Sequence, residues 1–213
     1  MIDEPFGPIA ARRAAAIAGH EGDAGLALVL LGHPDAATRA TALAALARMD
    51  MLGATTLAAA LADPSPAVRR RAVVLAVPNR SVPLAALLAD DDATVVEAAA
   101  YACGERSPAD PDAVAGLSAV VTDHRDPLCR EAAVAALGAI GDPDGLPAVL
   151  AATHDRATVR RRAVIALAPF SGADVDAALT QATGDRDWQV RQAAEDLLRF
   201  SRPDATPSQL RTT

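Results

Sequence analysis

The most regular feature of this chain is a pattern of polar and apolar positions that recurs about every thirty residues. Each copy begins with an Asp or a His, passes through a short turn to an Arg, and then continues into Ala and aliphatic residues at helical spacing. The clearest copy is segment 63–72, in which Asp63 is followed by Arg69 and Ala72. A fixed period of this size is typical of stacked supersecondary units, and it argues against a globule with one central core.

The Arg of each copy defines a reference position, called here the ladder position. An Ala lies three residues after it and usually a Val one residue before it, so that these two share one buried helix face. The ladder residues are Arg39, Arg69, Glu97, Arg130, Arg160 and Arg191. The pattern predicts a helix around each of them, over 36–48, 67–77, 93–103, 127–140, 157–169 and 188–200.

A second, shorter helical run precedes each copy, and Gly and Pro separate the two runs. These runs cover 25–31, 52–62, 82–89, 112–122, 146–154 and 174–183. Each repeat is therefore a hairpin of a helix A and a helix B, and the segment from Ala11 aligns with 160–170 as an orphan helix B. The predicted fold is all-α, a right-handed α-solenoid of about six helical hairpins with an N-terminal capping helix.

The ends of the chain set the predicted domain limits. Glu195, Asp196 and Arg199 give the last helix a polar face suited to the end of a stack. After Pro203 the sequence has no apolar period. We expect residues 1–202 to form a single solenoid domain and residues 203–213 to form a flexible tail.

Composition supports helices and narrows the function. Of the 213 residues, 54 are Ala and only 2% are aromatic, which favours closely packed helices. The formal charge of −7 argues against a groove that tracks phosphates, so no nucleic-acid partner is expected. All 20 basic residues are Arg, which leaves no Schiff-base lysine. The N-terminus has no basic region typical of a signal peptide. The longest stretch without Asp, Glu or Arg is 51–62, which is too short to span a bilayer. We therefore expect a cytoplasmic protein without membrane contact.

The Asp-Pro-x-x-x-Val-Arg-x-x-Ala pattern of segment 63–72 resembles a HEAT repeat, and the short period is similar to the bacterial subgroup first noted in bilin lyases. The resemblance covers nearly the whole chain and implies a curved solenoid whose B helices line the concave side. The third repeat departs most, with Glu97 in place of Arg and Gly104 where Leu is usual, so a bend in the stacking is expected there.

Three histidines stand at one place in the repeat. His33, His124 and His154 each precede the ladder position by six residues. One interpretation is a turn residue that caps helix B and bonds to a neighbouring repeat. The other is a metal or acid–base site that uses adjacent Asp residues. Adjacent repeats lie roughly 10 Å apart, whereas metal ligands converge within about 2 Å of one ion, so we favour the cap and expect no metal and no cofactor.

The catalytic sites of two similar enzyme families have no counterpart in this sequence. His20-Glu21 is similar to one His-Glu pair of the HEAT-repeat enzyme deoxyhypusine hydroxylase, whose site needs several such pairs. The DNA-alkylation-repeat glycosylases use a basic concave face with aromatic residues, but here Tyr101 and Trp188 are three repeats apart. Cys103 and Cys129 fall in or near B helices and are expected to be small core residues. No catalytic residue is predicted; the alternative to a binding protein is a lyase-like enzyme, or an enzyme subunit, that acts on a tetrapyrrole or another small ligand.

The B helices carry the most suggestive surface pattern. Positions one and five past the ladder lie on one helix face and combine Arg with Ala, Val and Ile. The predicted partner-binding residues are Arg70, Arg71, Val74, Tyr101, Arg161, Arg162 and Ile165. Such a surface suits an acidic or amphipathic segment of a protein partner, or a second copy of the chain. The predicted function is a non-catalytic interaction scaffold or adaptor; alternatively, Val74 and Ile165 pack against neighbouring repeats and the Arg residues only solubilise the outside.

Overall fold

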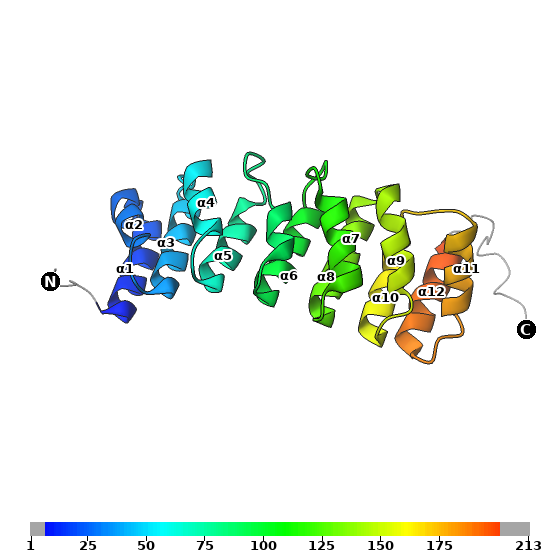
Figure 1. Ribbon diagram of the computed structural model, residues 1–213. Coiled ribbons are helices and arrows are strands. Elements are labelled where there is room, and N and C mark those ends of the chain that lie inside the picture. Colours follow the sequence, from blue (N-terminus) through cyan, green and yellow to red (C-terminus); the bar gives the residue numbers. More distant parts are fainter. Residues whose placement is uncertain (1–6, 201–213) are drawn as a thin grey trace, which may run out of the picture. The chain divides into compact units, whose positions relative to one another are not determined.

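The computed structural model describes residues 7–200, and within this part of the chain all regular structure is helical (Figure 1). The described residues form twelve α-helices and two short 3₁₀ helices. Their bounds are α1 Pro8–Glu21, α2 Ala24–Leu30, α3 Ala36–Arg48, α4 Ala54–Leu61, α5 Pro66–Ala76, η1 Ala85–Ala89, α6 Ala93–Gly104, α7 Ala113–Asp123, α8 Pro127–Ile140, η2 Pro143–Gly145, α9 Leu146–Ala152, α10 Ala157–Ala166, α11 Ala173–Ala182 and α12 Trp188–Phe200. The all-α prediction is confirmed.

The chain divides into two compact units, residues 1–106 and residues 107–213. In the first unit α2 pairs with α3, α4 with α5 and η1 with α6, while the B helices α1, α3, α5 and α6 contact one another in order (Figure 1). Helix α1 packs on α3 without a helix A of its own, as predicted for the N-terminal cap. In the second unit α7 pairs with α8, α9 with α10 and α11 with α12, and α10 contacts both α8 and α12. The predicted tail 203–213 lies outside the described residues, and the single domain over 1–202 stays a prediction.

Asp side chains start most of the B helices by local hydrogen bonding. The carboxylate of Asp35 accepts the backbone N–H of Thr38 at 2.8 Å, and that of Asp126 accepts the N–H of Leu128 at 2.9 Å. These bonds satisfy N–H groups that have no partner within the first helical turn. At the other end, Gly141 follows α8 with a φ of 67°, a left-handed conformation that Gly adopts at little cost.

Most predicted helix bounds shift by one or two residues, and two elements differ more. The run 82–89 was expected to be helical from its first residue, but only Ala85–Ala89 is helical and it is a 3₁₀ helix. Pro83 has no N–H to donate, and too few residues remain before Asp90 to build an α-helix. Helix α10 ends at Ala166 rather than at residue 169, because Pro169 disfavours helical conformation in the residue before it.

Small residues let neighbouring B helices approach closely. The core is rich in buried Ala, including Ala72, Ala100 and Ala163, each fully buried three residues after a ladder position. At two crossings the contact is closer still: a Cβ on Gly19 would lie 2.9 Å from the backbone of Ala45, and one on Gly138 would lie 2.7 Å from that of Ala166. At these places the distance between helices is set by the absence of a side chain.

Gly138→Ala is therefore expected to destabilise the protein by about 1–3 kcal/mol, because the added methyl group meets the backbone of α10. Equilibrium urea unfolding measures the change. Gly25→Ala is the matched control, since its Cβ would meet only Asp23 Oδ1 at 3.4 Å; it should be neutral or stabilising by up to about 1 kcal/mol. Equal stabilities for the two variants would mean that α8 and α10 can separate at little cost.

The ladder arginines join consecutive repeats through bidentate ion pairs. In each pair Nε and Nη2 of the arginine donate to the two carboxylate oxygens of an aspartate 21 to 25 residues later. The pairs are Arg39–Asp63, Arg69–Asp90, Arg130–Asp155 and Arg160–Asp185, with contacts of 2.6 to 2.8 Å. Their side chains are 7% to 19% exposed, so they are partly shielded from water. Such a fork fixes the register between repeats as well as adding energy.

These ion pairs shift the pKa values of both partners in the direction that keeps them charged. Hydrogen bonding from the guanidinium holds the pKa of Asp90, Asp155 and Asp185 below the ordinary value. At Asp63, burial raises the pKa, but the hydrogen bonds from Arg39 and from the Ser65 N–H outweigh it and the net shift is downward. The ladder is therefore fully ionised at neutral pH.

The turn before each B helix explains the histidines. Asp63 also accepts the N–H of Ser65, two residues on, and in the same way His33 Nδ1 accepts the N–H of Asp35 at 3.0 Å and His124 Nδ1 that of Asp126 at 3.1 Å. His33 and His124 therefore lie in the turn and bond to its backbone, as expected, but the residues that cap the B helices are Asp35 and Asp126. Neither histidine comes after a repeat that has a ladder arginine. The preceding ladder position is Ala11 for His33, since Ala11 aligns with Arg160, and Glu97 for His124.

Two of the aspartates that bind ladder arginines do not stand six residues before the next ladder position. Asp91 and His154 occupy that position, whereas the carboxylates that bind are those of their neighbours Asp90 and Asp155. The loops differ in length by a residue, and the position that can reach back to the preceding arginine decides which side chain is used.

Candidate functional site

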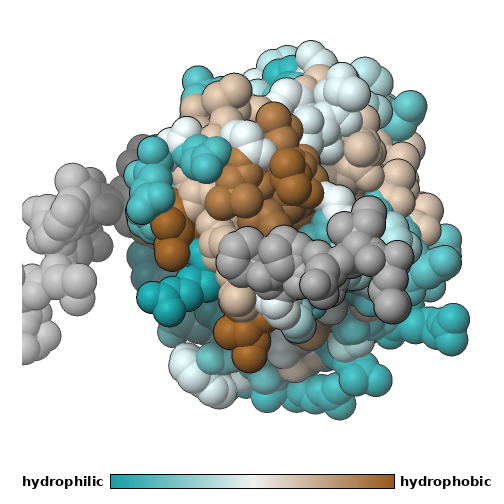
Figure 2. Space-filling view, turned by 90° about the vertical axis from the view of Figure 1, so that its left-hand side faces the viewer, coloured by the Kyte–Doolittle hydropathy of each residue, from teal (hydrophilic) through white to brown (hydrophobic). Residues whose placement is uncertain are grey.

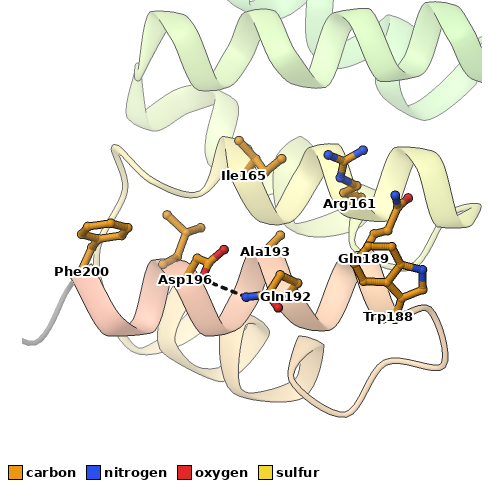
Figure 3. A pocket seen from close by; sticks show the side chains of 9 residues that line it. Arg161, Ile165, Trp188, Gln189, Gln192, Ala193, Asp196 and Phe200 are labelled. Carbon is orange, nitrogen blue, oxygen red and sulfur yellow. Dashed lines mark hydrogen bonds between the residues drawn. The ribbon is translucent and has the colours of Figure 1, made fainter. Parts of the chain in front are cut away.

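An apolar groove lies between the B helices α10 and α12 in the second unit (Figure 3). Its volume is about 280 Å³, slightly below the range of pockets that enclose small ligands. Helix α10 contributes Arg161 and Ile165, and one face of α12 contributes the rest of the lining: Trp188, Gln189, Gln192, Ala193, Asp196, Leu197 and Phe200. Four of these α12 residues, at 188, 192, 196 and 200, are spaced one turn apart on a common face.

Large apolar side chains in this groove are left open to solvent. Trp188 and Phe200 stand at its two ends, and Ile165 lies between them opposite Ala193 (Figure 3). They are 64%, 84% and 40% exposed. Aromatic residues with this exposure cost free energy in water, and their grouping around a hollow is typical of an interaction site rather than of scattered surface residues.

The polar groups of the groove are few. Arg161 is exposed beside the Trp188 end, and within residues 7–200 no carboxylate pairs with it. Asp196 already accepts hydrogen bonds from Gln192 Nε2 at 3.0 Å and from Arg199 Nη1 at 3.1 Å. The groove thus combines an apolar floor with one available cation.

The predicted partner-binding residues fall into two groups. Arg70, Arg71 and Val74 are exposed on α5, and Tyr101 is 59% exposed on the adjacent helix α6, all in the first unit. In the second unit, Arg161 and Ile165 line the groove, while Arg162 lies 3.5 Å from Glu131 of α8. Val74 and Ile165 are 46% and 40% exposed, so each keeps part of its surface open to solvent, and the alternative in which they pack against neighbouring repeats stays untested. That the seven residues form one binding surface stays a prediction.

Reasoning from the sequence missed the aromatic ends of the groove. The sequence pattern concerns positions one and five past the ladder, which in α12 are Gln192 and Asp196, both part of the lining. Trp188 and Phe200 continue the same stripe by one turn in each direction. A hydrophobic pattern followed along the whole helix would have found them.

A second exposed apolar area lies at the end of the first unit formed by α1 and α2. Figure 2 faces this end and shows apolar side chains gathered on it. The large apolar residues exposed on these helices are Ile9, Ile17, Leu28 and Val29. By contrast, α12 at the other end of the described chain exposes Glu195 and Arg199.

The remaining candidate groups have structural surroundings. Cys103 and Cys129 are buried, as expected for small core residues. His20 Nε2 lies 3.0 Å from Arg48 Nη1, away from any second His-Glu pair. Within residues 7–200 no three His, Cys, Asp or Glu side chains are grouped so as to hold a metal ion, and no helix there is both long and apolar enough to cross a membrane.

Comparison with known proteins supports the repeat architecture. Residues 81–168 match the family model of HEAT repeats. The structure of YibA from Escherichia coli superposes with a TM-score of 0.66 at 17% identity, over 95% of this chain and 85% of that one. An engineered protein gives a TM-score of 0.59 at 21% identity, over 89% of this chain and 63% of that one. At these identities the likeness concerns the fold, and among curated proteins no significant match was found.

Proposed function

Because the chain is a HEAT-repeat protein, we propose that it is a non-catalytic interaction scaffold that binds a protein partner on its B-helix face. Solenoids of HEAT repeats generally serve as protein-interaction scaffolds, since stacking presents a long row of equivalent helix faces. The anchor of the proposed site is the groove between α10 and α12 in the second unit.

One observation carries this proposal: large apolar side chains remain exposed around a hollow on the B-helix face. Trp188 and Phe200 are aromatic residues of the kind that dominate interface energetics, and Ile165 adds apolar surface that a partner would cover. A groove of about 280 Å³ with both ends exposed is better suited to a few side chains of a partner than to an enclosed small molecule.

The charge of the groove indicates the chemistry of the partner. Arg161 has no carboxylate partner among the described residues, whereas Asp196 is already hydrogen bonded. The proposed ligand is an amphipathic segment that places an apolar side chain between Ile165 and Trp188 and an acidic side chain on Arg161. In the first unit, Arg70, Arg71, Val74 and Tyr101 offer the same combination of residue types.

Self-association is a separate part of the proposal. The apolar end formed by α1 and α2 is the surface that a second copy would cover with the largest gain, because Ile9 and Val29 are 79% and 74% exposed. Sedimentation of the wild-type protein and of Val29→Asp over a range of concentrations tests this part independently of the groove.

Ile165→Asp is expected to reduce partner binding at least tenfold, because it places a charge on the apolar floor of the groove. Trp188→Ala and Arg161→Glu should also weaken binding, the latter with a reduced dependence on salt. Proteins captured by the wild type from an extract of the native host would be quantified against each variant, and the candidate partner then purified and titrated by calorimetry.

Met51→Asp is the matched control, since Met51 is an exposed apolar residue of the first unit that lies outside the groove and outside the apolar end formed by α1 and α2. It should retain the partner, and all four variants should keep wild-type helicity and melting. If the purified partner binds Ile165→Asp and Trp188→Ala as tightly as the wild type, the groove is not the site.

A further inference from the structure

The four complete ion pairs of the ladder show what an arginine at this position binds. In each, Nη1 donates to a carbonyl of the turn that precedes its own helix, as in Arg69 to the Asp63 oxygen at 2.9 Å and Arg160 to the Asp155 oxygen at 2.8 Å. This contact orients the guanidinium plane. The opposite edge, Nε and Nη2, then receives both oxygens of an aspartate from the next repeat.

Arg191 of α12 repeats the first half of this arrangement. Its Nη1 donates to the carbonyl oxygens of Asp185 at 2.7 Å and Arg186 at 3.2 Å, the same two turn positions that Arg130 uses. Arg191 is half-buried, and within residues 7–200 no carboxylate contacts its Nε–Nη2 edge. The donor fork is thus already oriented, and the repeat that would supply its acceptor is missing from the described chain.

We propose that the Nε–Nη2 edge of Arg191 is a binding site for a carboxylate of a helical partner protein, which continues the stack at α12. The binding is bidentate, and the ligand chemistry is inferred from four occupied examples in the same molecule. A preoriented fork of this kind loses little conformational freedom when it binds.

The occupied examples also indicate how the partner presents the carboxylate. Asp63, Asp90 and Asp185 each lie in the turn before a helix and accept the N–H of the residue two positions on. The partner is therefore a helical hairpin with an aspartate in such a turn. A second copy of this chain does not fit as well through its first repeat, because the acceptor place there is occupied by His33.

Arg191 adjoins the proposed groove, so this inference rests on the proposed function and specifies the partner further. Trp188 precedes Arg191 by three residues, within one turn of α12, and lines the end of the groove. A hairpin stacked on α12 would cover Trp188 and place its carboxylate on Arg191 in the same contact.

The first experiment uses the partner isolated in the groove experiment. Arg191→Gln should weaken its binding about ten- to hundredfold, as expected for loss of a charge-assisted bidentate contact. Arg199→Gln, an exposed arginine of the same helix, should change affinity by less than twofold. If Arg191→Gln binds like the wild type while Ile165→Asp does not, the groove proposal stands and this inference is wrong.

The second experiment needs no partner. A second copy of residues 171–200, inserted directly after Phe200 in the full chain, supplies the missing acceptor through its own Asp185. This protein should melt about 4 °C above the same insertion with Asp185→Asn in the copy, and the difference should vanish when Arg191 is Gln. Equal melting of the two insertions, or no gain of helicity from either, would overturn the inference.

A carboxylate from within the chain would also overturn it. Asp204 lies outside the described residues, and if it occupied Arg191, Asp204→Asn and Arg191→Gln would lower the melting temperature of the isolated protein equally and would not act additively. We expect Asp204→Asn to leave both melting and partner affinity unchanged.

Discussion

Replacing Arg106 with Met should lower the free energy of unfolding by about 3–5 kcal/mol, the largest effect expected of any single substitution in this chain. Arg106 is 3% exposed, and its guanidinium donates to four backbone carbonyls, of which only those of Ala76 and Asn79 also accept a backbone N–H of the loop. These are the oxygens of Ala76 and Asn79 on Nη2, of Val82 on Nη1 and of Val77 on Nε, at 2.6 to 3.2 Å. Met fills a similar volume but removes the side-chain donor from all four carbonyls, and those of Val77 and Val82 have no backbone donor to replace it.

Urea unfolding would measure this loss. Arg71→Met is the control, because Arg71 is exposed on α5 and should change stability by less than about 0.5 kcal/mol. Arg106→Lys should fall between Met and the wild type, since an ammonium group keeps the charge but cannot reach carbonyls in as many directions. If Arg106→Met unfolds at the wild-type urea concentration, segment 76–82 must be held by contacts other than these.

Arg106 illustrates a feature that the period could not predict. The ladder arginines were found because they recur, and helices α3, α8 and α12 have the predicted bounds. Arg106 has no equivalent that recurs in the other repeats. It follows α6 at the end of the third repeat, and in that repeat an irregular loop and a 3₁₀ helix replace helix A. The carbonyls of such a loop need donors from elsewhere, and periodicity gives no information about which residue supplies them.

The sequence indicated the residues of the ladder but not how they pair. The repeating Asp and Arg were recognised within each repeat, but the bidentate pairs form between repeats, as in Arg69 with Asp90 of the following one. Which carboxylate reaches back depends on loop length, which is why Asp90 and Asp155 are used in place of Asp91 and His154. Stacking geometry, and not the local motif, decides the pairing.

The candidate site was likewise predictable in position but not in shape. The spacing of Arg161 and Ile165 placed both on the exposed face of a helix B, where they are found. The hollow beside them exists because α12 packs against α10 with small Ala193 between large Trp188 and Phe200. Such a hollow depends on the packing of two helices, and a pattern along one helix cannot show it.

Asp185→Asn is expected to destabilise the protein by about 2 kcal/mol at neutral pH, because Asn keeps the shape of the side chain but removes the charge that faces the Arg160 guanidinium. Arg160 is only 8% exposed in its side chain, so it would be left largely buried without its counter-ion. The turn should survive, since the oxygen of Asn can still accept the N–H of Asp187.

The same variant tests the cause through pH. Hydrogen bonding from Arg160 lowers the pKa of Asp185 in the folded protein, so the stabilisation is complete above the ordinary Asp pKa and is lost as pH falls through the lowered folded value. The stability difference between wild type and Asp185→Asn should therefore be constant near neutrality and close in strong acid. It should not close on the alkaline side, because the pKa of Arg160 is raised and the guanidinium stays charged. A difference that is independent of pH down to pH 2 would mean that the loss comes from packing and not from the ion pair, and the ladder would then hold the repeats by shape alone.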